Sequence, residues 1–423
     1  MKVIIPLMVF LVSCGVTEDE IPSFTKAAPP KNQVHLGRLL FHDKILSGNK
    51  NISCSTCHHV LAASGDGLSL PVGEGGCGFA SARVTRCNGD RIHERVPRNS
   101  PSLFNAGEEE FKVMFADGRV AMLSNGRIDS PAKELLPDGL DSALAAQALF
   151  PITSGTEMAG QRGENLQGDL ADIGDFEAIW SHVVNKLKAI PDYVRMFEGN
   201  ITPARMANAI AAFEAEAFRA TDSPYDRYLN GDESALSLNA KLGMEIFNGK
   251  GRCHLCHSGK FQTNHRFASI GMVQIGPGKG DGDYGMEDFG REQVTGKRSD
   301  RYKFRVPSLR NVAHTGPWGH CGSYNSLRAI IKHHLDPVFA LENWSVQNAV
   351  LPWDQEFDRD FLVHSDFSAR DQIALSSQIP DINLTEREID RLIDFLESLT
   401  DTSSLNIRHH MPDWVPSGLP IFD

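Results

Sequence analysis

The chain has 423 residues, enough for two or three domains of ordinary size. Hydrophobic residues make up 41% of it and charged residues 23%, a composition that excludes a disordered, collagen-like or multi-span membrane chain. The formal net charge of −12 argues against a surface that wraps a phosphate backbone, so no nucleic acid is expected as a partner.

The first residues have the pattern of an export signal. A positive start precedes an apolar run at residues 3–12, which is too short to span a bilayer. Residues 11–14 (Leu-Val-Ser-Cys) are similar to a bacterial lipobox, in which Cys14 becomes the lipidated first residue of the mature protein. We therefore expect a lipoprotein signal peptide at 1–13, a tether at 14–31, and a lipid-anchored protein on the periplasmic side of a bacterial envelope membrane. A plain secretory peptide cleaved nearby is the alternative.

Two cysteine motifs carry the main chemical signal. Residues 54–58 read Cys-Ser-Thr-Cys-His and residues 253–257 read Cys-His-Leu-Cys-His, so both have the form C-x-x-C-H. In this pattern two thiols add to the vinyl groups of one haem, and the histidine supplies an axial nitrogen to the iron. A single C-x-x-C could be a redox dithiol or half of a zinc site, but two copies of the longer pattern on an exported chain indicate two covalent haems. The expected haem-binding residues are Cys54, Cys57, His58, Cys253, Cys256 and His257.

The remaining cysteines point to a disulfide. Cys77 and Cys87 lie in a glycine-rich loop, and an exported chain folds outside the reducing cytoplasm. We expect these two residues to pair. Cys321 is left over.

A repeated helix precedes each haem motif. Residues 36–41 (LGRLLF) and 242–247 (LGMEIF) both have amphipathic spacing and both lead into C-x-x-C-H. Between the motifs, residues 177–187 and 203–219 have helical patterns, and the segment 223–232 interrupts them. The pattern predicts two similar helical units joined at this segment.

The predicted fold is therefore all-α, with two cytochrome c-like domains, long loops and one covalent haem in each domain. We expect the N-terminal domain at 32–222 and the C-terminal domain at 223–403, which ends with an amphipathic helix at 385–400. A proline-rich tail at 404–423 follows.

The chain resembles the bacterial di-haem cytochrome c peroxidase family, which includes the MauG-type enzymes. No single motif is decisive, but several occur together in the family's order along residues 35–400. Besides the two haem motifs, they are 37–41, 98–105 (RNSPSLFN), 117–119 (DGR), 157–158 (EM), 223–232 and 306–312 (VPSLRNV).

The resemblance implies that the N-terminal haem meets peroxide and the C-terminal haem takes electrons from a donor. His58 and His257 are then the proximal ligands of these two haems. The family's distal pocket offers a Gln, a Pro and a Glu, which correspond here to Gln147, Pro151 and Glu157. A carboxylate over the iron can move a proton between the two peroxide oxygens. Without the family, Glu157 would be read as a solvated loop acid and Gln147 as an exposed helix residue.

The first haem site departs from the family's usual pattern. Many members close the peroxide site with a histidine about sixteen residues beyond the proximal one, and this sequence has Glu74 there. No histidine lies between His59 and His93. We expect the N-terminal haem to be high-spin and open, with no reductive activation.

The second haem departs as well. The family's sixth ligand, usually Met or Tyr, lies fourteen residues after a loop histidine, and counting from His320 leads to His334, which follows His333. We predict that His334 is the sixth ligand and that the haem is bis-His. Met272 and Met286 are the weaker candidates.

Two further family features lie between the haem domains. The family holds a calcium ion there with an Asn side chain and the carbonyls of a Thr-x-Pro segment, which Asn99, Thr315 and Pro317 match. The family's Trp between the haems is replaced by Ala116. Trp318 could substitute for it, although packing is the commoner role of a Trp.

Three functions remain. The first is a peroxidase that reduces hydrogen peroxide to water with electrons from a small cytochrome or cupredoxin. The second is a MauG-like oxidase that uses peroxide to modify a side chain of a partner protein. The third is a plain electron carrier or redox sensor, in which Gln147 and Glu157 would have no use.

Overall fold

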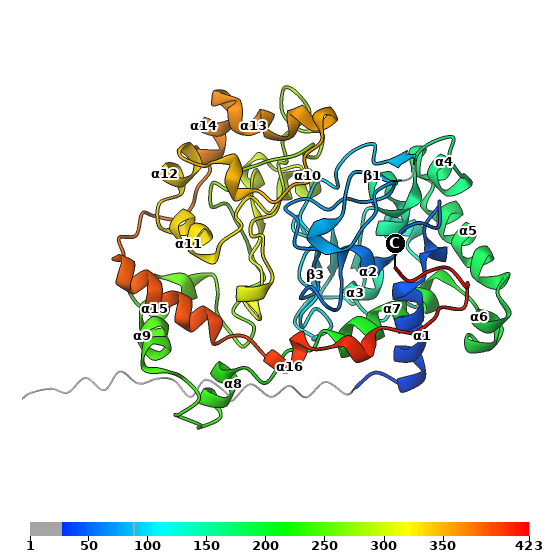
Figure 1. Cartoon of the computed structure of the whole chain (residues 1–423), viewed down its shortest axis with the longest axis horizontal. Helices are drawn as coiled ribbons and strands as arrows, with labels where there is room; N and C mark the ends of the chain where they lie inside the picture. The colour runs from blue at the N-terminus through cyan, green and yellow to red at the C-terminus, as the bar shows by residue number, and fades with distance from the viewer. Residues whose placement is uncertain (1–27, 88, 423) are drawn as a thin grey trace, which may run out of the picture.

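The computed structural model describes residues 28–87 and 89–422, so the expected signal peptide, Cys14 and most of the tether lie outside the described residues. Two helical lobes lie side by side (Figure 1). The N-terminal lobe contains the helices drawn in blue to green, α1 to α7, and the C-terminal lobe contains those drawn in green to orange, α9 to α15. Within the described residues, no helix is both long and apolar enough to cross a bilayer.

The helices of the N-terminal lobe are α1 (Lys31–His42), α2 (Cys54–Cys57), α3 (Ala143–Gln147), α4 (Leu166–Asp172), α5 (Phe176–Lys188), α6 (Pro191–Met196) and α7 (Pro203–Ala217). The chain continues through α8 (Pro224–Leu229), α9 (Leu238–Asn248), α10 (Arg291–Thr295), α11 (Leu327–Leu335), α12 (Pro337–Glu342), α13 (Leu362–Ser365), α14 (Phe367–Leu375), α15 (Glu386–Glu397) and α16 (Thr402–Leu405).

The strands are short and belong to the loops. They are β1 (Arg86–Cys87), β2 (Asp90–Arg91), β3 (Val113–Met114), β4 (Val120–Met122), β5 (Ile128–Asp129), β6 (Phe267–Ala268) and β7 (Phe304–Arg305). They pair antiparallel as β1-β2, β3-β4-β5 and β6-β7. The helical fold is confirmed, but the all-α prediction missed these strands because two or three residues are too few to show an alternating pattern.

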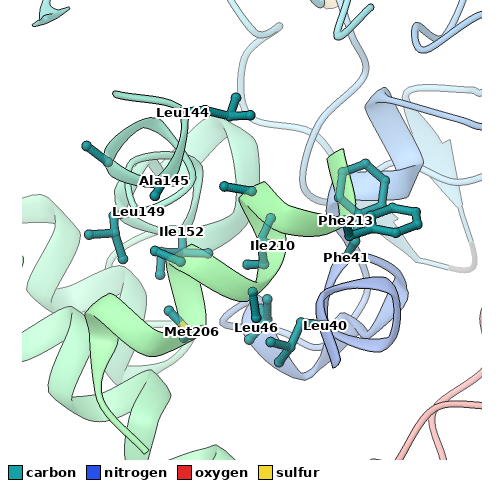
Figure 2. Packing of buried hydrophobic residues seen from close by; sticks show 14 of the residues in the cluster. Leu40, Phe41, Leu46, Leu144, Ala145, Leu149, Ile152, Met206, Ile210 and Phe213 are labelled. Atoms are coloured by element: carbon teal, nitrogen blue, oxygen red, sulfur yellow. The ribbon is translucent and has the colours of Figure 1, made fainter. Parts of the chain in front are cut away.

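Helices α1 and α7 form the centre of the N-terminal core, shown in Figure 2. Their backbones touch at Gly37, where an added Cβ would lie 1.8 Å from the carbonyl oxygen of Ala209. One turn further along α1, the ring of Phe41 packs on that of Phe213 with centroids 5.1 Å apart. A glycine and an alanine-rich partner helix therefore allow this close crossing.

The C-terminal lobe repeats the same crossing between α9 and α15. A Cβ at Gly243 would lie 1.9 Å from the carbonyl oxygen of Arg391. Phe247, four residues after Gly243, packs on Phe395 with centroids 5.1 Å apart. The internal repeat inferred from the two LG-containing segments is confirmed in three dimensions.

The predicted helix ends are close to the observed ones. The segments expected at 177–187 and 203–219 are α5 and α7, and α7 ends two residues early at Ala217. The final helix was expected from residue 385 but begins at Glu386, because Thr385 caps it by accepting the backbone N–H of Glu388. The same helix ends at Glu397, before the predicted residue 400.

The C-terminal tail returns to the N-terminal lobe. Its red trace crosses to the side of α1 in Figure 1. Ile407 and Val415 are buried, and the Ser417 hydroxyl donates to the Asp43 carboxylate at 2.6 Å. The tail therefore forms part of the surface of the N-terminal lobe.

Candidate haem and metal sites

The first C-x-x-C-H motif forms the short helix α2. Thr56 accepts the backbone N–H of Ser53 at 3.1 Å, which starts the turn, and the thiols of Cys54 and Cys57 are not joined to each other. Nδ1 of His58 lies 3.0 Å from the carbonyl oxygen of Ser64. A ring whose Nδ1–H donates to a carbonyl keeps Nε2 unprotonated for a metal, so this donor set fits a haem iron.

The second motif has the same arrangement on a tighter turn. Residues Cys253–Leu255 form a 3-10 turn that begins after Arg252, whose φ of 54° is left-handed. Nδ1 of His257 lies 3.0 Å from the carbonyl oxygen of Gln262, which again leaves Nε2 for a metal. The two motifs therefore present equivalent imidazoles.

His334 faces His257. Their ring centroids are 6.4 Å apart with an interplanar angle of 58°, and Nδ1 of His334 lies 2.8 Å from the carbonyl oxygen of Ile330. A first-row metal ion sits about 2 Å from an imidazole nitrogen, so rings that share one metal on opposite sides have centroids about 6 Å apart. The pair therefore fits one iron between two imidazoles.

The other candidate ligands have different partners. Both nitrogens of the buried His333 are engaged, Nδ1 with the Tyr324 hydroxyl and Nε2 with the carbonyl of Ile270, each at 2.8 Å. The sulfur of Met272 accepts the Ser323 hydroxyl at 3.5 Å. Met286 is half-buried against the apolar cluster that contains Met272. This geometry favours His334 over the alternatives.

The three expected distal residues come from one continuous segment. Gln147 ends α3, Pro151 begins a 3-10 turn, and Glu157 lies in a π-helical turn at Gly155–Ala159. All three are half-buried. Such π-turns occur often at functional sites because they point side chains where an α-helix would not.

The charge of Glu157 contributes to the pKa values of both thiols in the first haem motif. Burial is the main cause that raises the pKa of the Cys54 thiol to about 12, and the carboxylates of Glu214 and Glu157 add to it. Burial also raises the pKa of the Cys57 thiol, to which Asp66 and Glu157 contribute. Met158, which follows Glu157, belongs to the buried cluster against which Cys54 and Cys57 pack, so the turn of Glu157 and the first motif share one core.

The charge of Glu157 also acts on Lys279, which belongs to the C-terminal lobe. Burial is the main cause that lowers the pKa of Lys279, with Arg119 and Arg98 acting in the same direction. Asp288 and Glu157 raise it. Sequence reasoning missed Lys279 because it lies in a glycine-rich loop far from every motif.

Glu74, at the position of the family's closing histidine, is held away from any ligand role by two amides. Its Oε1 accepts Asn49 Nδ2 at 2.8 Å and Asn51 Nδ2 at 2.7 Å. Its backbone N–H donates to the carbonyl of Thr156 at 3.1 Å, so its loop lies against the turn of Glu157.

The two flanking histidines have other contacts. His59 stacks edge-on against Phe79 with centroids 4.5 Å apart, and Nε2 of His93 lies 3.1 Å from Glu164. Each ring therefore has a partner of its own, and the open peroxide site stays a prediction.

The predicted disulfide is confirmed, with Cys77 and Cys87 bonded. Within the same loop the buried guanidinium of Arg83 donates to several backbone carbonyls, including those of Val72 and Gly76 at 2.6 Å each. The loop is therefore fixed in shape. The leftover Cys321 is buried and donates to the carbonyl of Val273 at 3.1 Å.

A small pocket between the lobes contains part of the expected calcium set. It is lined by Asp66, Asn99 and Thr315 among others, while Pro317 is buried just beyond Gly316, which also lines it. The amide nitrogen of Asn99 donates to the carbonyls of Leu68 and Ser69, at 2.8 and 3.2 Å, so its side-chain oxygen is available to a cation.

Asp66 is a site residue that the sequence did not reveal. It is 1% exposed, and within residues 28–87 and 89–422 its Oδ2 has no hydrogen-bond partner. Burial raises the pKa of this carboxyl to about 7. Its Oδ1 accepts the backbone N–H of Leu68 at 3.0 Å, and the free Oδ2 in a polar pocket fits a calcium ion. The other residues that line the pocket are not acids, so no sequence pattern marks Asp66.

Trp318 belongs to the C-terminal lobe. Its indole N–H donates to the carbonyl of Val312 at 3.0 Å, and its ring packs against the two apolar clusters of that lobe. The structure thus gives Trp318 the packing role that the sequence analysis named as the commoner one.

Known proteins match this chain over most of its length. Residues 31–234 match the family model described as di-haem cytochrome c peroxidase. The chain is 32% identical to the methylamine utilization protein MauG of Methylorubrum extorquens, over 74% of this chain and 71% of that protein. It is 30% identical to the cytochrome c551 peroxidase of Pseudomonas aeruginosa, over 77% and 76% of the two chains. A crystal structure of a MauG-like protein associated with microbial copper homeostasis matches with a TM-score of 0.61 and 25% identity, over 93% of this chain and 98% of that one.

Proposed function

The chain belongs to the di-haem cytochrome c peroxidase family, and from that premise we propose that it reduces hydrogen peroxide to water with electrons from a small redox protein. One H2O2, two electrons and two protons give two waters. The observation that carries the proposal is the difference between the two haem motifs. Two imidazoles face each other at the second, whereas the turn that carries Glu157 shares a core with the first.

The electrons enter at the C-terminal haem and pass to the N-terminal haem in this proposal. A site with two protein ligands on its iron can exchange electrons but has no position for peroxide. A site that supplies one histidine, His58, with Glu157 on a turn of the same core would leave that position open. The donor is a cytochrome c or a cupredoxin.

The residues of the chain hold the haems and move the proton. The haem iron, when bound, supplies the position where peroxide is held and the electrons that reduce it. The two pairs of cysteines attach the haems covalently, and His58, His257 and His334 ligate iron. Glu157 takes the proton from one peroxide oxygen and gives it to the other, which becomes the leaving water. Gln147 and Pro151 shape the distal side.

A calcium ion occupies the pocket between the lobes in this proposal. Its ligands are the side-chain oxygen of Asn99, carbonyls at Thr315 and Pro317, and the carboxylate of Asp66. The observation that supports it is the buried carboxyl oxygen of Asp66 that no described residue satisfies.

The location proposed is the periplasmic side of a bacterial envelope membrane, with a lipid anchor at Cys14. The Cys77–Cys87 disulfide supports an oxidising compartment. Labelling with radioactive palmitate, lost in a Cys14→Ser variant, tests the anchor.

A MauG-like oxidation of a partner protein is the second candidate. There peroxide takes two electrons from a side chain of the partner rather than from a donor. The sequence identity with MauG and the His257–His334 pair, where a Met is usual in the peroxidases, favour it.

Haem content is the first test of both candidates. Mass spectrometry and a pyridine haemochrome assay should show two haems per chain that survive acid and organic solvent. One haem per chain, or release of haem on denaturation, would overturn the covalent assignment.

Turnover then separates the candidates. Rapid steady-state consumption of peroxide with reduced cytochrome c or cupredoxin supports the peroxidase. Negligible turnover, together with a fast spectral change of the diferric protein on adding peroxide, supports the oxidase. No reaction with peroxide at all would leave only the electron carrier.

A further inference from the structure

Arg305 of strand β7 crosses from the C-terminal lobe to the segment that lacks the family's tryptophan. Its backbone N–H donates to the carbonyl of Ala116 at 2.7 Å, and its Nε donates to the carbonyl of Phe115 at 3.4 Å. The guanidinium therefore lies alongside Ala116, at the boundary between the two lobes.

The charge of this guanidinium has no protein counterpart. In the part of the chain that the structure describes, its buried Nη1 has no hydrogen-bond partner and the side chain makes no ion pair. Burial lowers the pKa of Arg305 to about 10, with no carboxylate acting against it. The side chain as a whole is half-buried, but a cation whose buried nitrogen lacks a partner is unfavourable.

The nearby acids are already paired with another arginine. Arg98 holds Asp117 at 2.5 Å and Asp288 at 2.7 Å. Burial opposes ionisation of Asp117, but Arg98 and Arg119 hold its pKa down at about 2. Neither acid is therefore free to pair with Arg305, so its guanidinium can accept an anion that is not part of the polypeptide.

We propose that Arg305 binds a haem propionate at the lobe boundary and raises the reduction potential of that haem. This inference rests on the proposed function, since it requires bound haem. A haem carries two propionate groups, and Nη1 can donate to a carboxylate oxygen while Nε stays on Phe115. A fixed positive charge stabilises the reduced iron, which has one positive charge fewer, relative to the oxidised iron.

Arg305 then acts as a positioning residue for electron transfer between the lobes. It ties a propionate of one haem to the backbone of residues 115 and 116. Which haem supplies the propionate is read from the experiment, because the two haems titrate separately in spectroelectrochemistry.

The test uses the holoprotein with Arg305→Gln, Arg305→Lys and the control Arg266→Gln. Arg266 lies on the neighbouring segment, where its carbonyl accepts the N–H of Val306 at 2.8 Å, but its side chain is exposed. The two readouts are the midpoint potential of each haem and the propionate bending bands in resonance Raman spectra.

In Arg305→Gln, one haem should shift to a lower potential and its propionate band should move, while Arg266→Gln leaves both unchanged. Arg305→Lys should keep most of the potential and still move the band, because a lysine lacks the planar fork. Unchanged potentials and bands in Arg305→Gln would overturn the proposal.

If Arg305→Gln does not fold, the band in Arg305→Lys decides alone, and an unchanged band overturns the proposal. Both readouts need bound haem but no peroxide. Peroxide turnover therefore tests the proposed function separately. A wild-type protein without two haems would already contradict the proposed function in the haem-content assay.

Discussion

The hydroxyl of Tyr324 lies 2.8 Å from Nδ1 of His333, and this hydrogen bond distinguishes His333 from the adjacent His334. His333 is buried with both nitrogens occupied. The ring of its neighbour His334 lies beside that of His257, with Nδ1 on the carbonyl of Ile330, because residues next to each other on a helix project in different directions.

This difference predicts distinct spectra for two matched variants. His334→Ala should convert the low-spin bis-His haem to a high-spin or water-ligated form. His333→Ala should keep the low-spin haem, although loss of buried hydrogen bonds lowers the stability of the lobe by about 1–3 kcal/mol. Electron paramagnetic resonance of the diferric proteins measures both. A thioether-to-iron charge-transfer band in the wild type would instead return Met272 or Met286 to the site.

The role of Glu157 as the distal acid is tested by replacing its carboxyl group with an amide. Glu157→Gln keeps the size of the side chain but cannot shuttle a proton, so the reaction with peroxide should slow by roughly 10²–10⁴-fold. Both haem spectra should stay nearly unchanged. Stopped-flow mixing of the diferric protein with peroxide gives the rate.

Glu74→Gln is the control for this experiment. The carboxylate of Glu74 accepts hydrogen bonds from the amides of Asn49 and Asn51. The rate of the reaction with peroxide should therefore change far less in Glu74→Gln than in Glu157→Gln. A slower reaction in Glu74→Gln than in Glu157→Gln would move the acid role to Glu74.

The calcium pocket is tested at Asp66. Removing the charge in Asp66→Asn should weaken calcium binding by about 10- to 100-fold, as loss of groups that support metal sites commonly does. Calorimetric titration of the chelator-treated holoprotein measures the affinity. The exposed Asp138 gives a matched control, since Asp138→Asn removes the same charge away from the pocket. Equal affinities in the two variants would exclude Asp66 from the site.

The repeated helix crossing predicts a sharp loss of stability on adding one methyl group. In Gly243→Ala the Cβ would lie 1.9 Å from the carbonyl oxygen of Arg391, so α9 and α15 must separate. We expect a loss of about 3 kcal/mol or more, at the upper end for overpacking. Urea unfolding of the holoprotein measures it. Asn239→Ala, on the exposed face of α9, should change stability by less than about 0.5 kcal/mol, and a similar loss in both variants would contradict the crossing.

The sequence by itself determined the features that depend on local spacing. The two C-x-x-C-H motifs, the helices α5, α7 and α15, and the Cys77–Cys87 pairing all follow from patterns within a few residues of each other. The repeated segments at 36–41 and 242–247 also predicted two similar helical units, and the structure then showed that each helix crosses a partner closely at its glycine.

Only the tertiary structure decided which groups meet across long separations. Asp66 is marked by an unpartnered oxygen, and Arg305 by its hydrogen bonds to residues 115 and 116. Counting from His320 had already led to His334, but the contacts that occupy both nitrogens of His333 come from Tyr324 and Ile270, which lie on other segments. Burial and the partners of a polar group are set by packing between distant segments, and no local pattern records them.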